Sequence, residues 1–76
     1  MAQYHYTAVF EPAEEGGFTV TVPALPGLVT QGDTIEEAHA MVEDAIRGYL
    51  EVLLKDGEEI PVEPGAPIPQ RIAVDL

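Results

Sequence analysis

The chain has 76 residues, which fit a single domain near the lower size at which a hydrophobic core can support a fold without disulfides or a metal. It contains no cysteine, so disulfides, thiolate nucleophiles and zinc sites of the cysteine type are excluded. Three basic residues stand against fourteen acidic ones, for a formal net charge of −11. This charge disfavours direct binding to DNA, RNA or anionic lipid. It favours a basic protein partner, although acidity also serves plain solubility.

The sequence contains no apolar run near the roughly 20 residues that a membrane-spanning helix needs. Its first residues, MAQYHYT, lack the basic and apolar regions of a secretion signal. We therefore expect one cytoplasmic domain over residues 1–76 that does not contact a membrane.

Alternation of apolar and polar residues predicts an antiparallel meander in the first half of the chain. The expected strands are residues 1–11, 18–22 and 28–32. In the first strand, the side chains expected to face the core are those of Tyr4, Tyr6, Ala8 and Phe10. An acidic, glycine-rich loop at residues 14–17 predicts a hairpin between the first two strands. Pro23 and Pro26 then predict an extended, unpaired segment before the third strand.

Residues 34–55 are predicted to form the one helix, because apolar residues recur there every three or four positions. The expected apolar stripe consists of Ile35, Ala38, Val42, Ala45, Ile46, Tyr49, Leu50 and Leu53. Thr34 and Glu37 have the spacing of a capping box at the start, and Gly57 is a natural C-terminal cap. Gly48 is costly inside a helix, so we expect it to mark close packing against the sheet or a partner.

Four prolines make residues 61–69 an extended linker. Residues 70–76 alternate again and predict a fourth strand, with Ile72, Val74 and Leu76 facing inward at the sheet edge beside the first strand. The expected fold is an α+β two-layer sandwich of order β-β-β-α-β, with an antiparallel sheet and one helix on one face. An unblocked edge on so small a sheet also favours a homodimer or a higher homo-oligomer.

The sequence offers little for catalysis. His5 and His39 have no partner supplied by a motif, and HExxH, phosphate-loop and GxSxG motifs are absent. Glu11 together with Glu36 or Glu37 could hold Mg²⁺ in a metal-dependent nuclease, but the helix dipole already explains acidic residues at a helix start. We expect no catalytic residue, no metal site and no cofactor, and hence no enzyme.

Several sequence blocks resemble the HicB antitoxin family. They are Tyr4 with VFE at residues 9–11, EGGFTVTVP at 15–23, LPG at 25–27, TQGDTIEEA at 30–38, Ala45-Ile46 and Ile60-Pro61. The resemblance implies a partial ribonuclease-H-like fold and binding to a small basic toxin of the HicA type, an mRNA-cleaving ribonuclease whose active site is then blocked. Ala24, His39 and Met41 depart from the usual family residues. The sequence ends without the DNA-binding domain that many members carry, so DNA binding and autorepression are not expected.

The expected function is therefore that of a HicB-like antitoxin that covers the catalytic surface of a basic ribonuclease toxin. The residues expected to contact the toxin are Glu11, Glu14, Glu15, Glu36, Glu37 and Glu43. The alternative is a self-assembling interaction module without a toxin, and the metal-dependent nuclease is a third possibility.

Overall fold

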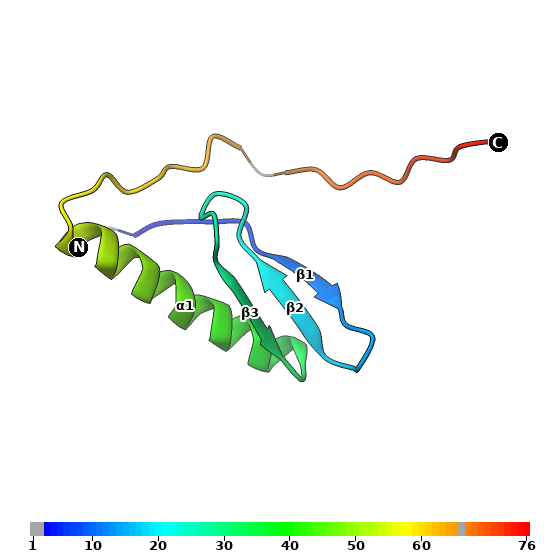
Figure 1. Cartoon of the computed structure of the whole chain (residues 1–76), viewed down its shortest axis with the longest axis horizontal. Coiled ribbons are helices and arrows are strands. Elements are labelled where there is room, and N and C mark those ends of the chain that lie inside the picture. The colour runs from blue at the N-terminus through cyan, green and yellow to red at the C-terminus, as the bar shows by residue number, and fades with distance from the viewer. Residues whose placement is uncertain (1–2, 66) are drawn as a thin grey trace.

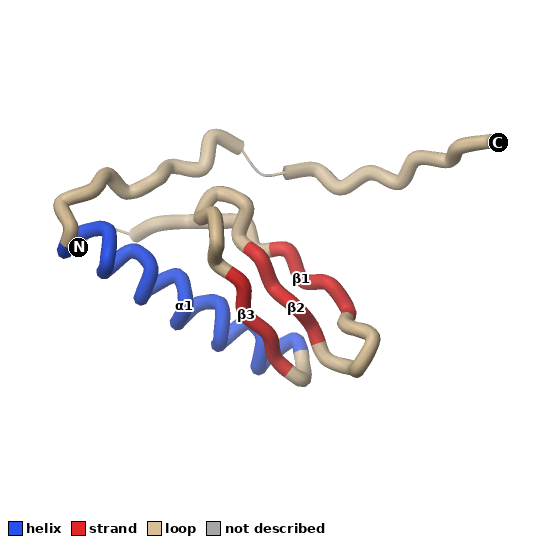
Figure 2. Tube along the Cα trace, viewed as in Figure 1, coloured by secondary structure: helices blue, strands red, loops and turns tan. Residues whose placement is uncertain are grey.

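The structure is a computed structural model that describes residues 3–65 and 67–76. Its elements are β1 (Val9–Pro12), β2 (Phe18–Thr21), β3 (Val29–Gly32) and α1 (Ile35–Lys55). The strands form one antiparallel sheet in the order β1-β2-β3, and α1 packs across one face of it (Figure 1, Figure 2). The predicted α+β architecture and the order of these four elements are confirmed.

The first strand is shorter than predicted. Pairing between β1 and β2 begins at Val9↔Thr21, and residues 3–8 continue outside the ladder. The reason is that β2 ends at Thr21 and the chain then turns at Pro23, which leaves no neighbouring strand to pair with them. Of the side chains expected to face the core, Tyr6, Ala8 and Phe10 pack against it, whereas Tyr4 is half exposed.

The segment between β2 and β3 is not the extended excursion that its prolines predicted. It makes two consecutive tight turns, closed by hydrogen bonds from Leu25 N–H to Val22 C=O (2.9 Å) and from Leu28 N–H to Leu25 C=O (3.2 Å). Pro26 and Gly27, with Gly27 at φ +86°, have the sequence and conformation of a type II turn. The two turns direct Leu25 into the core, where its side chain is fully buried.

The core lies between the sheet and one face of α1. Its buried members are Val20, Val22, Leu25, Leu28, Ala38 and Val42. Most of the predicted helical stripe contributes to the core or its margin, but Ile35 is 48% exposed. Both predicted helix ends are confirmed. The Thr34 hydroxyl accepts from Glu37 N–H (3.1 Å), and the N–H groups of Gly57 and Glu58 cap the last carbonyls of the helix in a Schellman pattern.

Gly32 and Gly48 differ in their surroundings. A Cβ added to Gly32 would lie 2.5 Å from the backbone nitrogen of Ala38, so the start of α1 rests directly on the end of β3. Gly48 is exposed and a Cβ there would meet nothing within 4 Å. The prediction that Gly48 packs closely against the sheet is therefore wrong. The close approach occurs at Gly32, where the start of α1 leaves no room for a side chain.

The C-terminal segment does not join the sheet. Residues 67–76 are extended, exposed and outside any strand, so the predicted fourth strand over residues 70–76 is not paired within this chain (Figure 1). The linker explains this course. Tyr6 donates its hydroxyl to Pro61 C=O (2.6 Å), and Thr7 donates both its N–H (2.7 Å) and its hydroxyl (2.8 Å) to the Glu63 carboxylate. Beyond this anchor, prolines keep the chain extended and it leads away from the sheet.

Candidate partner-binding surface

The strand register places the β1–β2 hairpin beside the start of α1. Phe18 pairs with both Pro12 and Gly32, so the hairpin loop and the end of β3 lie at the same end of the sheet. Gly17 has a φ of +75°, and a Cβ on it would lie 2.7 Å from the carbonyl oxygen of Gly32. The hairpin is itself closed by bonds between Ala13 and Gly17 and between Gly16 and Ala13, each 3.0 Å long. The loop and the helix start therefore form one compact unit.

This unit collects carboxylates without any basic residue. We call it the acidic end, and its members are Glu14, Glu15, Asp33, Glu36 and Glu37. All five side chains belong to exposed residues. The first Lys or Arg in the sequence is Arg47, so neither the hairpin nor the helix start contains a Lys or Arg. The acidic end is thus a region of strongly negative potential on an already acidic protein.

A shallow hollow of about 370 Å³ lies within the acidic end. Glu15, Asp33 and Glu37 contribute to its wall, as do the apolar side chains of Phe18 and Met41. Met41 is 48% exposed, so an apolar surface is available to a binding group beside the carboxylates. An apolar surface bordered by carboxylates suits the long side chains of Lys and Arg, which combine an aliphatic stem with a charged head.

Glu37 also has a structural part in the acidic end. Its N–H donates to the Thr34 hydroxyl, and its carboxylate accepts from the N–H of Asp33 at 3.4 Å. In the usual capping box the Glu37 carboxylate would accept from the N–H of Thr34, the N-cap residue. Here it accepts from the N–H of Asp33, one residue earlier. This pair of bonds fixes the orientation of the helix start and of the carboxylates around it.

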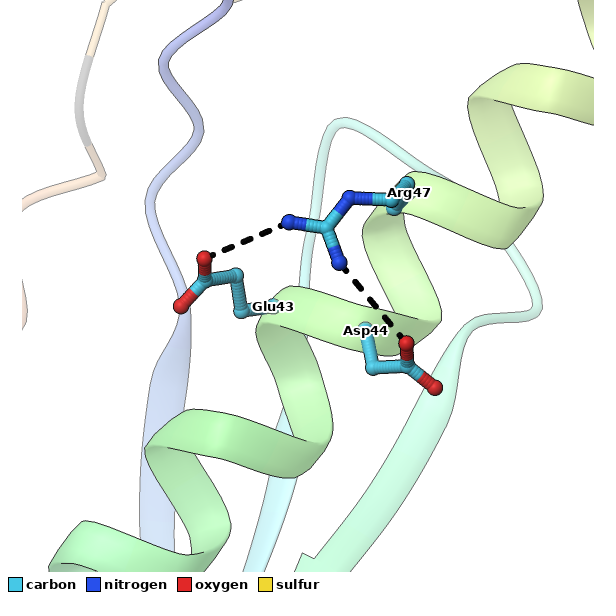
Figure 3. A network of polar contacts seen from close by, with 3 residues as sticks. All are labelled: Glu43, Asp44 and Arg47. Carbon is cyan, nitrogen blue, oxygen red and sulfur yellow. Dashed lines mark hydrogen bonds and ion pairs between the residues drawn. The ribbon is translucent and has the colours of Figure 1, made fainter.

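Two of the six predicted contact residues lie elsewhere. Glu11 is on the sheet face opposite α1, because the neighbouring Phe10 packs against the core and strand side chains alternate. Glu43 is in the middle of α1 and pairs with Arg47 at 3.4 Å, while Asp44 approaches Arg47 at 3.8 Å (Figure 3). The structure places Glu15 and Glu37 on one hollow, next in sequence to Glu14 and Glu36, whereas Glu11 and Glu43 do not line this hollow.

Sequence reasoning missed three residues of this surface. Asp33, Phe18 and Met41 were not among the residues expected to contact a partner. The acidic block at residues 33–37 was a sufficient signal for Asp33. Phe18 and Met41 could not be found in this way, because their place in the hollow depends on how α1 crosses the end of the sheet.

Among the described residues, 3–65 and 67–76, no group of three or more His, Asp or Glu side chains is placed to hold a metal ion. Nor is any helix among them long and apolar enough to cross a membrane.

Comparison with known proteins points in one direction. Residues 6–73 match a family described as the HicB_like antitoxin of bacterial toxin-antitoxin systems. A UPF0150 protein of Thermoplasma acidophilum is 48% identical over 56 residues, which cover 74% of this chain and 81% of that protein. Antitoxin HicB 1 of Photorhabdus laumondii is 46% identical over 57 residues, and Antitoxin HicB of Escherichia coli K12 is 35% identical over 57. Each alignment spans 75% of this chain, but only 37% and 41% of the two antitoxins.

Proposed function

This chain belongs to the HicB-like antitoxin family, and from that premise we propose that it neutralises a small basic ribonuclease toxin of the HicA type by covering its catalytic surface. The observation that carries the proposal is the family match over residues 6–73. The relatives named as HicB antitoxins are longer than this chain, and the region they share with it includes most of the folded body.

The charge distribution supports a basic partner. A net charge of −11, with no Lys or Arg in the first 46 residues, gives a long-range attraction to a cationic protein. Such complementarity acts mainly on the rate of encounter and on the choice of partner. A ribonuclease needs cationic groups to hold RNA, and an acidic surface competes for those same groups.

The acidic end is the surface that we assign to the toxin. Its carboxylates are held on a hairpin and a helix start that contact each other, and its hollow has room beside Phe18 and Met41 for a basic side chain. Glu11 and Glu43 lie outside this surface, so we expect them to contribute less than the carboxylates of the acidic end.

The proposal predicts a short basic reading frame next to this gene, and co-expression with its product tests it. We expect the two proteins to co-purify, growth to be restored in cells that express the toxin, and affinity to fall as salt rises. Neutralising three carboxylates of the acidic end (Glu14→Gln, Glu15→Gln and Glu36→Gln together) should weaken binding by about tenfold or more.

A matched control removes the same charge from the other end of α1. The triple variant Glu51→Gln, Glu58→Gln and Glu59→Gln changes three exposed carboxylates and should leave binding nearly unchanged. Equal losses in the two triple variants would show that net charge matters and the acidic end does not. Absence of a complex at low salt, together with no rescue of growth, would refute the antitoxin activity.

A further inference from the structure

The C-terminal segment, residues 67–76, carries an apolar pattern that none of the described residues of this chain covers. Ile72 and Val74 are 76% and 73% exposed, and Leu76 is exposed as well. In an extended chain these three side chains lie on one face, with Arg71, Ala73 and Asp75 on the other. Burial of each aliphatic side chain would be favourable. The segment therefore has the pattern of a strand that lacks its sheet.

A groove of about 580 Å³ lies where such a strand would fit. One wall is the stretch from Gln3 to Phe10, and the other is the helix surface around His39, Val42 and Ile46. The groove exists because α1 packs mainly on β3 and β2, which leaves the β1 side of the sheet without a helix above it. Its walls include the partly buried apolar side chains of Tyr6, Ala8, Phe10 and Ile46.

The edge of β1 beside this groove is open. Ala13 donates its N–H to Gly17 C=O across the hairpin, and bonding alternates along an antiparallel pair. The backbone groups of Val9 and Glu11 are therefore directed to β2, whereas those of Ala8 and Phe10 face the free edge. Pro12 has no N–H to offer there, which limits the open edge to the residues that precede it. An added strand would pair with Phe10 and Ala8 and present its apolar side chains to the groove.

The linker indicates that this strand comes from another copy. Residues 61–63 are fixed against Tyr6 and Thr7, and the chain beyond them passes Pro23 and Ala24, at the end of the sheet. Pro64, Pro67 and Pro69 then favour an extended course that leads away from the body (Figure 1). A return to the chain's own β1 edge would require reversal of this stiff segment.

We propose that two copies of this chain exchange their C-terminal segments, so that residues 70–76 of each add to the β1 edge of the other and cover its groove. The exchange is isologous, so it closes as a two-fold dimer and leaves no segment exposed. It covers a surface other than the acidic end, and it does not depend on the proposed antitoxin activity.

Measurement of mass in solution on the full chain tests the exchange. We expect a dimer by multi-angle light scattering, and we expect Val74→Glu to weaken dimerisation by ~100-fold or more because it places a charge in an apolar groove. Ala73→Glu is the matched control on the opposite face of the same segment, and it should remain dimeric. A monomeric wild type, or equal effects of the two variants, would overturn the proposal.

A second measurement separates exchange from folding back within one chain. In a sample that mixes isotope-labelled and unlabelled copies, filtered NMR spectra report only contacts between copies. We expect such contacts between the methyl groups of Val74 or Leu76 in one copy and Phe10 or Ile46 in the other. If these methyl groups contact Phe10 and Ile46 only within one chain, the exchange is wrong.

Discussion

Two proline-containing segments of this protein differ in the burial of their aliphatic side chains. The turn segment, residues 22–28, and the C-terminal segment, residues 67–76, both lie outside the sheet, and both carry aliphatic residues near prolines. Leu25 in the first is fully buried, whereas Ile68 in the second is 77% exposed. The difference is that two hydrogen-bonded turns close the first segment over the core, and none of the described backbone bonds involves the second. Both segments carry large aliphatic side chains, so burial here depends on how the chain is closed.

The largest expected effect comes from truncating an aliphatic side chain in each segment. Leu25→Ala should lower the free energy of unfolding by about 2–5 kcal/mol, because it empties a fully buried site. Ile68→Ala should change it by no more than ~0.5 kcal/mol in the monomeric protein, as expected for an exposed site. Urea denaturation of both variants checks the comparison. Similar losses at the two positions would show that the segments do not differ in burial.

A pair of glycines sharpens the comparison within the folded body. Gly32→Ala should destabilise the protein by about 1–3 kcal/mol, since its Cβ would meet the backbone of Ala38 at 2.5 Å and the helix must shift. Gly48→Ala should instead stabilise it by roughly 0.5–1 kcal/mol, because the site is open and alanine favours the helix. Thermal unfolding followed by circular dichroism measures whether each variant is less or more stable than the wild type. Stabilisation by Gly32→Ala would contradict the close contact between β3 and α1.

An effect smaller than those at Leu25 and Gly32 is expected at Tyr6, which joins the body to the linker. Burial raises the pKa of Tyr6 above its ordinary value, with further contributions from Tyr4 and Glu63. The neutral phenol is the form that donates to Pro61, so Tyr6→Phe should cost about 0.5–1.5 kcal/mol at neutral pH. Because the folded-state pKa is the higher one, this stabilisation is complete below the unfolded pKa near 10. It is lost as pH rises through the folded value.

Unfolding of wild type and Tyr6→Phe between neutral pH and about pH 11 measures this difference. We expect the two curves of stability against pH to converge at the alkaline end. A difference that stays constant through this range would mean that the Tyr6 hydroxyl does not act through its proton.

Local patterns were enough to predict most of the fold. The meander follows from alternation and from a glycine-rich hairpin, and α1 follows from its apolar period and from Thr34 and Gly57 at its ends. The position of Leu25 could not be predicted, because proline and glycine indicate turns without showing which side chain the turns bury. The prediction of a fourth strand over residues 70–76 was limited for a related reason. Alternation of apolar and polar residues does not by itself form a strand, because a strand also needs a sheet edge within reach. The linker contacts at Tyr6 and Thr7 direct the chain away from that edge.

The candidate surface was predictable in part. Acidic residues in the hairpin and at the helix start were visible in the sequence, but their meeting depends on the register of Phe18 with Pro12 and Gly32. Glu11 and Glu43 were expected to belong to the same surface. Glu11 is separated from it by the alternation of side chains along β1, and Glu43 by its position in the middle of α1, where it pairs with Arg47.

The contact between Gly17, Gly32 and Ala38 also has a consequence for binding thermodynamics. It joins the hairpin, the end of β3 and the first turn of α1 at one point, so the nearby carboxylates are attached to closely packed backbone. A partner that docks there would not have to order a loop first, because the conformational entropy of this backbone is already lost when the protein folds. Because Gly17 and Gly32 have no side chains, the backbone can pack closely here and the acidic end is ordered before any partner binds.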